Sequence, residues 1–302
     1  MKILVTGGAG FIGSNLVEEL ARRGHAVVAF DNFYLGTRKN LEGLDIEVVN
    51  GDIRDADSVN KAASGVDIVF NKAAASSSPM FAKDLRGAVA VNIDGFINIL
   101  NASMENGIKK IIYASTSSIY GNLSPPLRED MNVTPPNFYA ATKLANEHLA
   151  KVYTSEYGIE TVGFRYMSVY GPKEEGKGVF ANLVSQFLWA IQKNESPVIY
   201  GSGEQTRDFV YVKDVVTANI LAMEKNNIGS EVFNIGTGTA TSLNSLITLL
   251  NRLLGKNVKP KYIKMPVKNY IDTQLGDISK ISAKLGFKPL YTLEAGIKDM
   301  LG

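Results

Sequence analysis

A tyrosine and a lysine four residues apart, Tyr139 and Lys143, lie in the helix-favouring segment NFYAATKLANEHL. On a helix, such residues are neighbours on one face, with Cβ atoms about 5–6 Å apart. A nearby ammonium favours the phenolate, so Tyr139 could serve as a general base near neutral pH. The chain has 13 tyrosines and many lysines, and about one such pair is expected by chance. Only the surrounding motifs can decide between catalysis and coincidence.

The composition excludes several classes of protein. Hydrophobic residues make up 45% and charged residues 21% of the 302 positions, which suits a chain that buries a large core. The net charge of +2 comes from interspersed acidic and basic residues, so we expect no nucleic-acid partner. With no cysteine and only two histidines, a metal site is not expected.

The N-terminal residues MKILVTGG lead directly into a strand-like segment, without the apolar core of a signal sequence. No segment approaches the length of a membrane span. We therefore expect a cytoplasmic protein without a membrane partner.

The first half of the chain alternates short β-branched segments with helical patterns. Strand-like segments are KILVTG, AVVAFD, IEVVNGD, DIVFNKAA and IKKIIYAS, and helices are expected at 11–23 and near 85–106. This alternation predicts an α/β fold of the Rossmann type, a doubly wound parallel sheet with helices on both faces.

The pattern changes after residue 171. A loop-like segment, GPKEEGKG, is followed by helices near 179–193 and 212–226 and by VFNIGTGTATSL, which reads as a strand leading into a capped helix. We expect a nucleotide-binding domain at 1–170 and a smaller C-terminal substrate-binding lobe at 171–302, with some of its segments returning to the Rossmann sheet.

Three glycines follow the first strand and open the next helix, at Gly7, Gly10 and Gly13. Glycines there permit a tight turn and a close approach of the backbone to a pyrophosphate, which the helix N-terminus attracts. Asp31 ends the next strand about twenty residues further on, where a carboxylate can bind ribose hydroxyls and repel a 2′-phosphate. The pattern predicts NAD rather than NADP, although tight turns alone could explain these glycines, Asp31 and Asp52.

Six motifs occur in the order TGGAGFIG, Asp31, GDI, STSSIYG, YAATK and YGSGEQTRDFVYVKD. In this order they resemble the extended short-chain dehydrogenase/reductases that act on nucleotide sugars, most of all the UDP-galactose (UDP-glucose) 4-epimerases. The resemblance covers essentially the whole chain. It implies that Tyr139 and Lys143 are the catalytic pair and that the hydroxyl of Thr116 holds the sugar O4.

The resemblance also implies which residues bind the ligands. The cofactor-binding set is Gly7, Gly10, Phe11, Ile12, Gly13, Asp31, Asn32, Asp52, Ile53, Ala73, Asn92, Tyr139 and Lys143. The UDP-sugar set is Thr116, Ser117, Ser168, Gly178, Val179, Tyr200, Arg207, Lys268 and Gln274. In this set Tyr200 stacks on uracil and the guanidinium of Arg207 grips the diphosphate, since its planar fork suits phosphate oxygens.

The implied reaction is oxidation followed by reduction at the sugar C4. Tyr139, its pKa lowered by Lys143 and the nicotinamide cation, takes the O4 proton while NAD takes the hydride. The resulting 4-ketose rotates and receives the hydride on its other face. Ser117 and Ser118 occupy positions where related dehydratases carry an acidic pair and decarboxylases a glutamate, which argues against those two reactions.

Several positions depart from the family pattern. Met167 and Ser168 replace the usual Phe-Asn, and Lys268 is a possible substitute for a missing arginine. Gln274 falls where large aromatic residues exclude an N-acetyl group, so an acetamido sugar could be admitted. Lys72 stands where leucine is more common, and the sequence offers no functional account of it.

Other functions stay open at this point. One is a different nucleotide-sugar enzyme of the same family, such as a uronic acid sugar epimerase, a dehydratase or a decarboxylase. Another is a non-catalytic protein that senses NAD. The resemblance further implies a homodimer formed through helices near 85–106 and 139–155, although packing on the sheet would produce the same apolar pattern.

Overall fold

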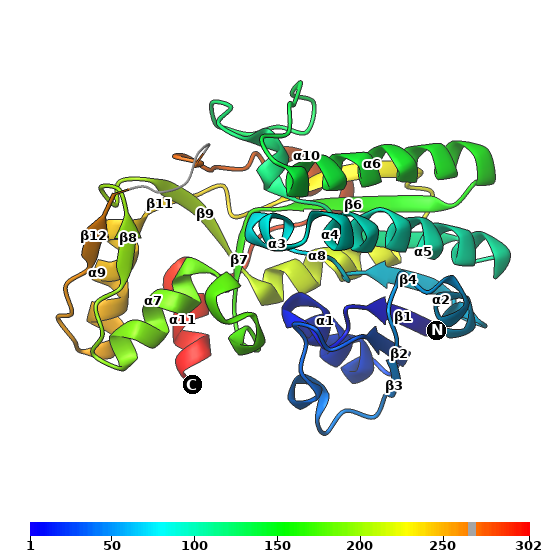
Figure 1. Ribbon diagram of the computed structural model, residues 1–302, viewed down its shortest axis with the longest axis horizontal. Coiled ribbons are helices and arrows are strands. Elements are labelled where there is room, and N and C mark those ends of the chain that lie inside the picture. The colour runs from blue at the N-terminus through cyan, green and yellow to red at the C-terminus, as the bar shows by residue number, and fades with distance from the viewer. Residues whose placement is uncertain (265–269) are drawn as a thin grey trace.

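The computed structural model describes residues 1–264 and 270–302 (Figure 1). Its centre is a sheet of seven strands, all paired in parallel. In spatial order these are β10 (Ser230–Ile235), β6 (Glu160–Tyr166), β5 (Lys110–Ala114), β4 (Ile68–Asn71), β1 (Lys2–Thr6), β2 (Ala26–Asp31) and β3 (Glu47–Asn50). The order reverses at β1, and the predicted doubly wound Rossmann-type fold is confirmed.

Both faces of the sheet are buried, because successive side chains along each strand point to opposite sides. Ile3 and Val5 pack on one side with helices α1 (Phe11–Arg22) and α8 (Val212–Glu224). Leu4 packs on the other side with α2 (Ala56–Ala63), α5 (Asp94–Glu105) and α6 (Phe138–Tyr157). The near-continuous apolar strands of the sequence therefore match a sheet covered by helices.

The prediction of one helix near 85–106 is wrong in one respect. The segment forms two helices, α4 (Leu85–Asn92) and α5, which meet at Ile93. The N–H of Ile93 still donates to Val89 O, and its carbonyl accepts from Ile97 N, so the ladder of hydrogen bonds is only locally disturbed. Before them lie the 3₁₀ helix η1 (Arg38–Leu41) and α3 (Ser78–Lys83), and after β5 comes η2 (Ser117–Tyr120).

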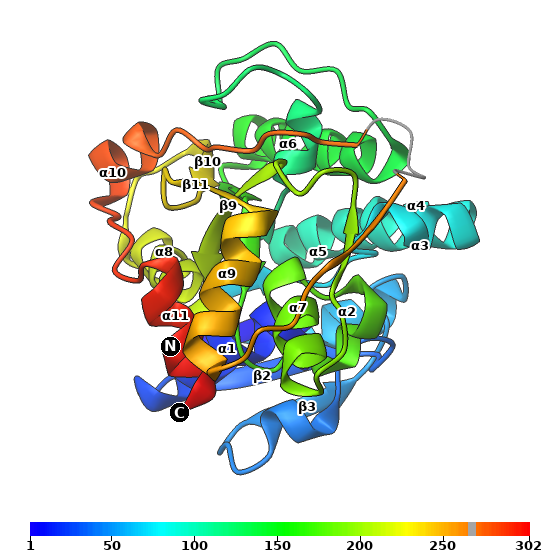
Figure 2. The same cartoon turned by 90° about the vertical axis from the view of Figure 1, so that its left-hand side faces the viewer.

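The remaining elements form a second lobe beside the sheet, at the left of Figure 1 and facing the viewer in Figure 2. Helices α7 and α9 lie side by side there in both views. The lobe contains the sheet β11 (Ala240–Ser242), β9 (Thr206–Tyr211) and β7 (Ser168–Tyr170), the pair β12 (Lys261–Ile263) and β8 (Val198–Tyr200), and the helices η3 (Glu175–Phe180), α7 (Leu183–Gln192), α9 (Leu243–Leu254) and α11 (Leu293–Leu301).

Three segments beyond residue 171 return to the first domain. Strand β10 pairs with β6, α8 packs on α1, and α10 (Ser279–Leu285) packs on β10 and α8. Helix α7 begins four residues later than expected, where the side chain of Asn182 accepts from Val184 N. Helix α9 starts at the predicted cap, with Ser242 accepting from Ser245 N. The boundary at residue 170 between the nucleotide-binding domain and the substrate-binding lobe stays a prediction.

Across the described ranges, none of the helices is long and apolar enough to cross a membrane.

Candidate active site

The loop after β1 has the geometry of a phosphate-binding turn. Gly7 has a φ of 64°, and a Cβ on Gly13 would lie 2.0 Å from the carbonyl oxygen of Gly7. Helix α1 begins with Gly10 as its N-cap, so no side chain caps it, and its first turn has no acidic residue. The first amides of a helix lack partners within the helix and carry partial positive charge, so they are free to bind an anion.

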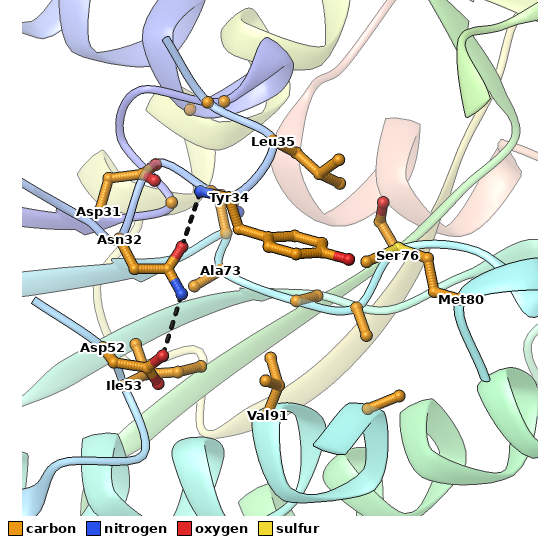
Figure 3. A pocket seen from close by; sticks show the side chains of 18 of the residues that line it. Asp31, Asn32, Tyr34, Leu35, Asp52, Ile53, Ala73, Ser76, Met80 and Val91 are labelled. Carbon is orange, nitrogen blue, oxygen red and sulfur yellow. Dashed lines mark hydrogen bonds between the residues drawn. The ribbon is translucent and has the colours of Figure 1, made fainter. Parts of the chain in front are cut away.

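A cavity of about 440 Å³ opens in front of this turn at the carboxyl ends of the strands (Figure 3). Ten of the predicted cofactor residues line it: Gly7, Gly10, Phe11, Ile12, Gly13, Asp31, Asn32, Asp52, Ile53 and Ala73. These residues come from the loops after β1, β2, β3 and β4, which the parallel topology brings to one edge. This is where ligands bind in doubly wound folds.

Asp31 is nearly buried at the end of β2. Its Oδ2 accepts a hydrogen bond from Ala9 N at 2.9 Å, and its Oδ1 accepts from Phe33 N at 2.7 Å. Burial raises the pKa of Asp31, while the backbone donors act in the opposite direction. The oriented carboxylate can accept from ribose hydroxyls and would repel a 2′-phosphate.

Asn32 and Asp52 form the neighbouring wall. Asn32 Nδ2 donates to Asp52 Oδ2 at 2.9 Å, and Asn32 Oδ1 accepts from Tyr34 N at 3.1 Å (Figure 3). Asp52 also pairs with Arg54 at 2.7 Å, and its hydrogen bonds with Arg54 hold the pKa of this carboxyl well below its usual range. The ring of Tyr34 extends across the cavity toward Ser76 (Figure 3).

Three predicted cofactor residues do not line the cavity: Asn92, Tyr139 and Lys143. Asn92 is buried, and its Oδ1 accepts from Ala75 N at 2.8 Å while its Nδ2 donates to Thr142 Oγ1 at 3.0 Å. Asn92 therefore ties the loop after β4 to helix α6 and supports the cavity from behind its wall.

The first turn of α6 carries Tyr139, and Asn137 caps this helix by accepting from Ala140 N at 2.9 Å. The Tyr139 ring lies against Phe81, with ring centroids 6.0 Å apart. The hydrogen bond from the Thr116 side chain lowers the pKa of Tyr139, but burial raises it by more. The structure thus unites Tyr139 and Thr116, two residues 23 positions apart in the chain.

Lys143 lies one turn further along α6 and is buried. Its Nζ donates to Ala114 O at 3.0 Å, and burial lowers its pKa to about 8. We expected the Lys143 ammonium to lower the pKa of Tyr139, but with the chain's own groups alone the pKa of Tyr139 is raised. Desolvation outweighs the hydrogen bond from Thr116, and the lowered pKa expected with bound NAD, whose nicotinamide cation was part of that expectation, stays a prediction.

A buried ion pair, missed by the sequence analysis, anchors the catalytic helix. Glu147 follows Lys143 by one turn of α6, and its carboxylate accepts from both Nε and Nη2 of Arg165, at 3.0 and 2.7 Å. It also accepts from Ser115 Oγ at 2.5 Å. The sequence signal for Glu147 was its spacing of four residues from Lys143, which places both on one face of α6. Its contacts with Ser115, just after β5, and with Arg165 on β6 hold α6 against the sheet.

Three predicted substrate residues meet through hydrogen bonds. Gln274 Nε2 donates to Ser117 Oγ at 2.7 Å, and Ser168 Oγ donates to Gln274 Oε1 at 2.8 Å. Ser117 follows β5, Ser168 opens β7, and Gln274 comes from the segment between β12 and α10. The amide of Gln274 therefore joins both lobes directly beside Thr116.

Arg207 on β9 is a largely buried cation. Its guanidinium lies 5.1 Å from the ring centre of Tyr270 and donates to Thr206 O at 2.7 Å, and burial lowers its pKa. Asp208, the next residue in the chain, could pair with Arg207, but its carboxylate instead accepts from Thr237 N and Gly238 N. Within residues 1–264 and 270–302 Arg207 forms no ion pair, which leaves its charge available to an anionic ligand.

The other predicted substrate residues lie on the exposed side of the second lobe. Val179 is 81% exposed and Tyr200, at the end of β8, is 38% exposed. Gly178 has a φ of 50° within η3, a conformation that side chains rarely adopt. Lys268 lies outside the described residues.

Sequence reasoning missed several residues of the cavity wall. These are Tyr34, Leu35, Ser76, Met80 and Lys177. Lys72 also lines the cavity, and its Nζ donates to Tyr166 OH at 3.1 Å. Burial and the neighbouring Lys143 lower the pKa of Lys72. Only Lys177 had a usable sequence signal, because it directly precedes the predicted substrate residue Gly178.

A doubly wound sheet with a glycine turn after β1 and a carboxylate at the end of β2 defines a nucleotide-binding protein of the Rossmann class. Residues 3–236 match the model of the NAD dependent epimerase/dehydratase family. The chain belongs to this family, and it is an NAD-dependent enzyme related to nucleotide-sugar epimerases.

Its relatives act on several UDP-sugars. The crystal structure of UDP-glucose 4-epimerase with UDP-glucose from Thermotoga maritima is 36% identical, with a TM-score of 0.94 over 100% of this chain and 97% of that one. UDP-glucuronic acid 4-epimerase from Bacillus cereus, solved with UDP-glucuronic acid and NAD, is 32% identical, with a TM-score of 0.91 over 99% and 98%. UDP-N-acetyl-alpha-D-glucosaminuronate decarboxylase of Bacillus cytotoxicus is 33% identical over 99% of this chain and 96% of that protein.

The residues present fit NAD. Uncapped α1 amides suit a diphosphate, and the Asp31 carboxylate suits an unphosphorylated ribose.

Proposed function

We propose that the protein is an isomerase that interconverts UDP-galactose and UDP-glucose, with N-acetyl forms as possible further substrates. The observation that carries this proposal is the assembly of Thr116, Tyr139 and Lys143 at the carboxyl edge of the sheet, beside the dinucleotide cavity. Such a constellation suits reversible oxidation of a secondary alcohol.

In this proposal the chain's residues move one proton. Tyr139 accepts the proton of the sugar O4 and later returns it, while Thr116 holds the same oxygen by a hydrogen bond. Bound NAD supplies the hydride acceptor and donor. Together with the nicotinamide cation of bound NAD, Lys143 favours the phenolate of Tyr139 during the reaction. The buried pair of Glu147 with Arg165 keeps helix α6 in position.

The second lobe holds the UDP group. Arg207 binds the diphosphate, Tyr200 stacks on uracil, and the backbone of Gly178 and Val179 contacts the base edge. The largely buried charge of Arg207, which forms no ion pair within the described residues, supports the first assignment. Tyr200 and Val179 are exposed, which leaves them accessible for the proposed contacts with uracil.

The chemistry around Thr116 bears on the competing reactions. Ser117 and Ser118 carry no acid group for elimination, which disfavours a dehydratase or decarboxylase. Epimerisation of a uronic acid sugar requires the same Thr116 and Tyr139 and therefore remains the second candidate. Its support is the likeness to UDP-glucuronic acid 4-epimerase.

The test is proton NMR of the purified protein with UDP-galactose and no added reductant. Conversion to a UDP-glucose mixture without accumulation of NADH supports the proposal. Absence of conversion, with NAD confirmed in the protein, refutes the hexose assignment, and UDP-glucuronic acid is then tested in the same assay. Failure with both sugars would favour another sugar nucleotide, such as an N-acetyl form, or a protein that only senses NAD.

We also propose a homodimer formed through α5 and α6. Exposed apolar side chains on and beside these helices, Met104, Val152 and Tyr157, support a partner on this face. Light scattering coupled to size-exclusion chromatography measures the mass directly. A mass near the 32.7 kDa of one chain would contradict the dimer.

A further inference from the structure

The segment that leads into η3 is attached to the first domain although it belongs to the second lobe. Asn15 Nδ2, on α1, donates to Pro172 O at 3.1 Å, and Lys173 pairs with Glu18 at 2.5 Å. A Cβ on Gly176 would lie 2.5 Å from Leu35 O, which shows how closely the loop approaches the segment after β2. These contacts fix the loop at the edge of the dinucleotide cavity.

Lys177 is the cation that this loop brings to the cavity. It lines the cavity, and its Nζ lies 5.3 Å from the ring centre of Phe11, the residue at which α1 begins. The uncapped amides of α1 start at this same residue. The ammonium and the positive end of the helix therefore lie close to each other, an arrangement that favours an anion between or beside them.

A buried carboxylate orients Lys177. Glu174 Oε1 accepts from Lys177 Nζ and from Asn182 N, both at 2.8 Å, and Glu174 Oε2 accepts from Ser185 Oγ at 2.6 Å. Because Glu174 divides its oxygens among three donors, the carboxylate is already satisfied. Within the described ranges the Lys177 ammonium donates this one hydrogen bond, and an ammonium has three donors.

The other cations of the cavity wall are occupied or placed differently. Arg54 directs two donors, Nε and Nη2, at the Asp52 carboxylate at 2.9 and 2.7 Å, whereas the ion pair of Lys177 with Glu174 uses one donor. Lys72 Nζ reaches Tyr166 at the end of β6, two strands away from its own strand β4. Lys83 ends the short helix α3 and is exposed. Lys177 is thus the cavity cation placed beside the phosphate-binding turn.

We propose that Lys177 is a cofactor-binding residue that contacts the diphosphate of NAD together with the first amides of α1. A diphosphate carries two negative charges, and a charge-assisted contact with an ammonium is stronger than one between neutral groups. The same loop carries Gly178 and Val179, so, if the proposed function holds, cofactor and UDP-sugar contact one short segment.

The test compares Lys177→Met with Lys173→Met in the full chain after removal of bound nucleotide. The two lysines lie in the same loop with side chains 22% and 24% exposed, but Lys173 faces Glu18 on the outer surface of α1. Isothermal titration at low ionic strength measures the Kd of NAD, of ADP-ribose and of adenosine. Adenosine has no phosphate and reports on the rest of the site.

We expect Lys177→Met to weaken NAD and ADP-ribose by about tenfold, with adenosine unchanged. Lys173→Met removes one contact of the loop, but the contacts of Pro172 with Asn15 and of Gly176 with Leu35 remain, so it should bind all three ligands as the unchanged protein does. Lys177→Arg should restore most of the affinity because it keeps the charge. The dependence of Kd on salt should also be shallower in Lys177→Met, because one ionic contact is lost.

Unchanged NAD affinity in Lys177→Met would overturn the proposal, and so would an equal loss for adenosine, which would indicate general damage to the loop. If Lys177→Met does not fold, Lys177→Gln is measured in its place against the same ligands. These readouts do not depend on turnover, so failure of the proposed epimerase reaction would leave the test intact.

Discussion

The side-chain amide of Gln274 donates to the hydroxyl of Ser117 at 2.7 Å, although 157 residues separate them in the chain. Ser117 directly follows Thr116, the proposed holder of the sugar O4, and Gln274 also accepts from Ser168. These two hydrogen bonds of Gln274 connect the proposed proton-transfer site to the second lobe. Gln274 is thus positioned to transmit the fit of the substrate lobe to the reacting hydroxyl.

Gln274→Leu should destabilise the protein by about 1–3 kcal/mol, because it leaves the buried hydroxyl of Ser117 and the half-buried hydroxyl of Ser168 without their partner. The KM for the UDP-sugar should rise as the segment around residue 274 loses its position. Urea unfolding and steady-state kinetics measure the two effects. Gln192→Leu, at the exposed end of α7, is the control, and equal stability of both variants would contradict this role.

Tyr139→Phe should lower kcat by about 10²–10⁴-fold, the range typical for loss of a positioned acid or base. Affinity for NAD should be unchanged, because the phenylalanine keeps the ring contact with Phe81. NMR turnover and titration with NAD provide the two measurements. Tyr157→Phe at the exposed end of α6 is the matched control, and near-normal turnover of Tyr139→Phe would exclude the residue as the base.

Lys143 should make stability depend on pH. Its pKa in the folded protein is about 8, below the value of 10.5 for an exposed lysine, so its burial costs stability wherever both states are protonated, below about pH 8. Between pH 8 and 10.5 the unfolded chain binds more protons than the folded one, and this cost disappears as the pH rises.

Lys143→Met should therefore be more stable than the unchanged protein at pH 7, by on the order of 1–3 kcal/mol, with the gap closing toward pH 10. Urea unfolding of nucleotide-free protein at both pH values measures the gap. A gap that stays constant with pH would mean that the lysine is not held in a desolvating environment.

Asp31→Asn should weaken NAD binding by about tenfold or more, because it removes the charge that strengthens the hydrogen bonds to the ribose. The affinity for NADP should fall much less, so the ratio of the two affinities, which favours NAD, should become smaller. Titration with both cofactors measures the change. Asp57→Asn, an exposed carboxylate on α2, should alter neither affinity, and an unchanged preference in Asp31→Asn would refute the assigned role.

Features that depend on local sequence could be predicted well. Parallel strands read as apolar segments, and the turn at Gly7, Gly10 and Gly13 requires its glycines through local backbone geometry. The helical spacing of four residues places Tyr139 and Lys143 on one face of α6. These features are determined by neighbours in the chain, which is why the fold was correctly expected.

Only the tertiary structure decided the contacts between distant segments. The partner of Ser117 is Gln274, that of Glu147 is Arg165, and Lys177 lies over Phe11. No spacing rule relates such residues, because their distance depends on how the lobes and the sheet pack. The direction in which the pKa of Tyr139 shifts also depends on its burial, which cannot be read from the sequence. The sequence alone therefore determined the elements and their motifs, while packing decided which charges are paired, buried or left for a ligand.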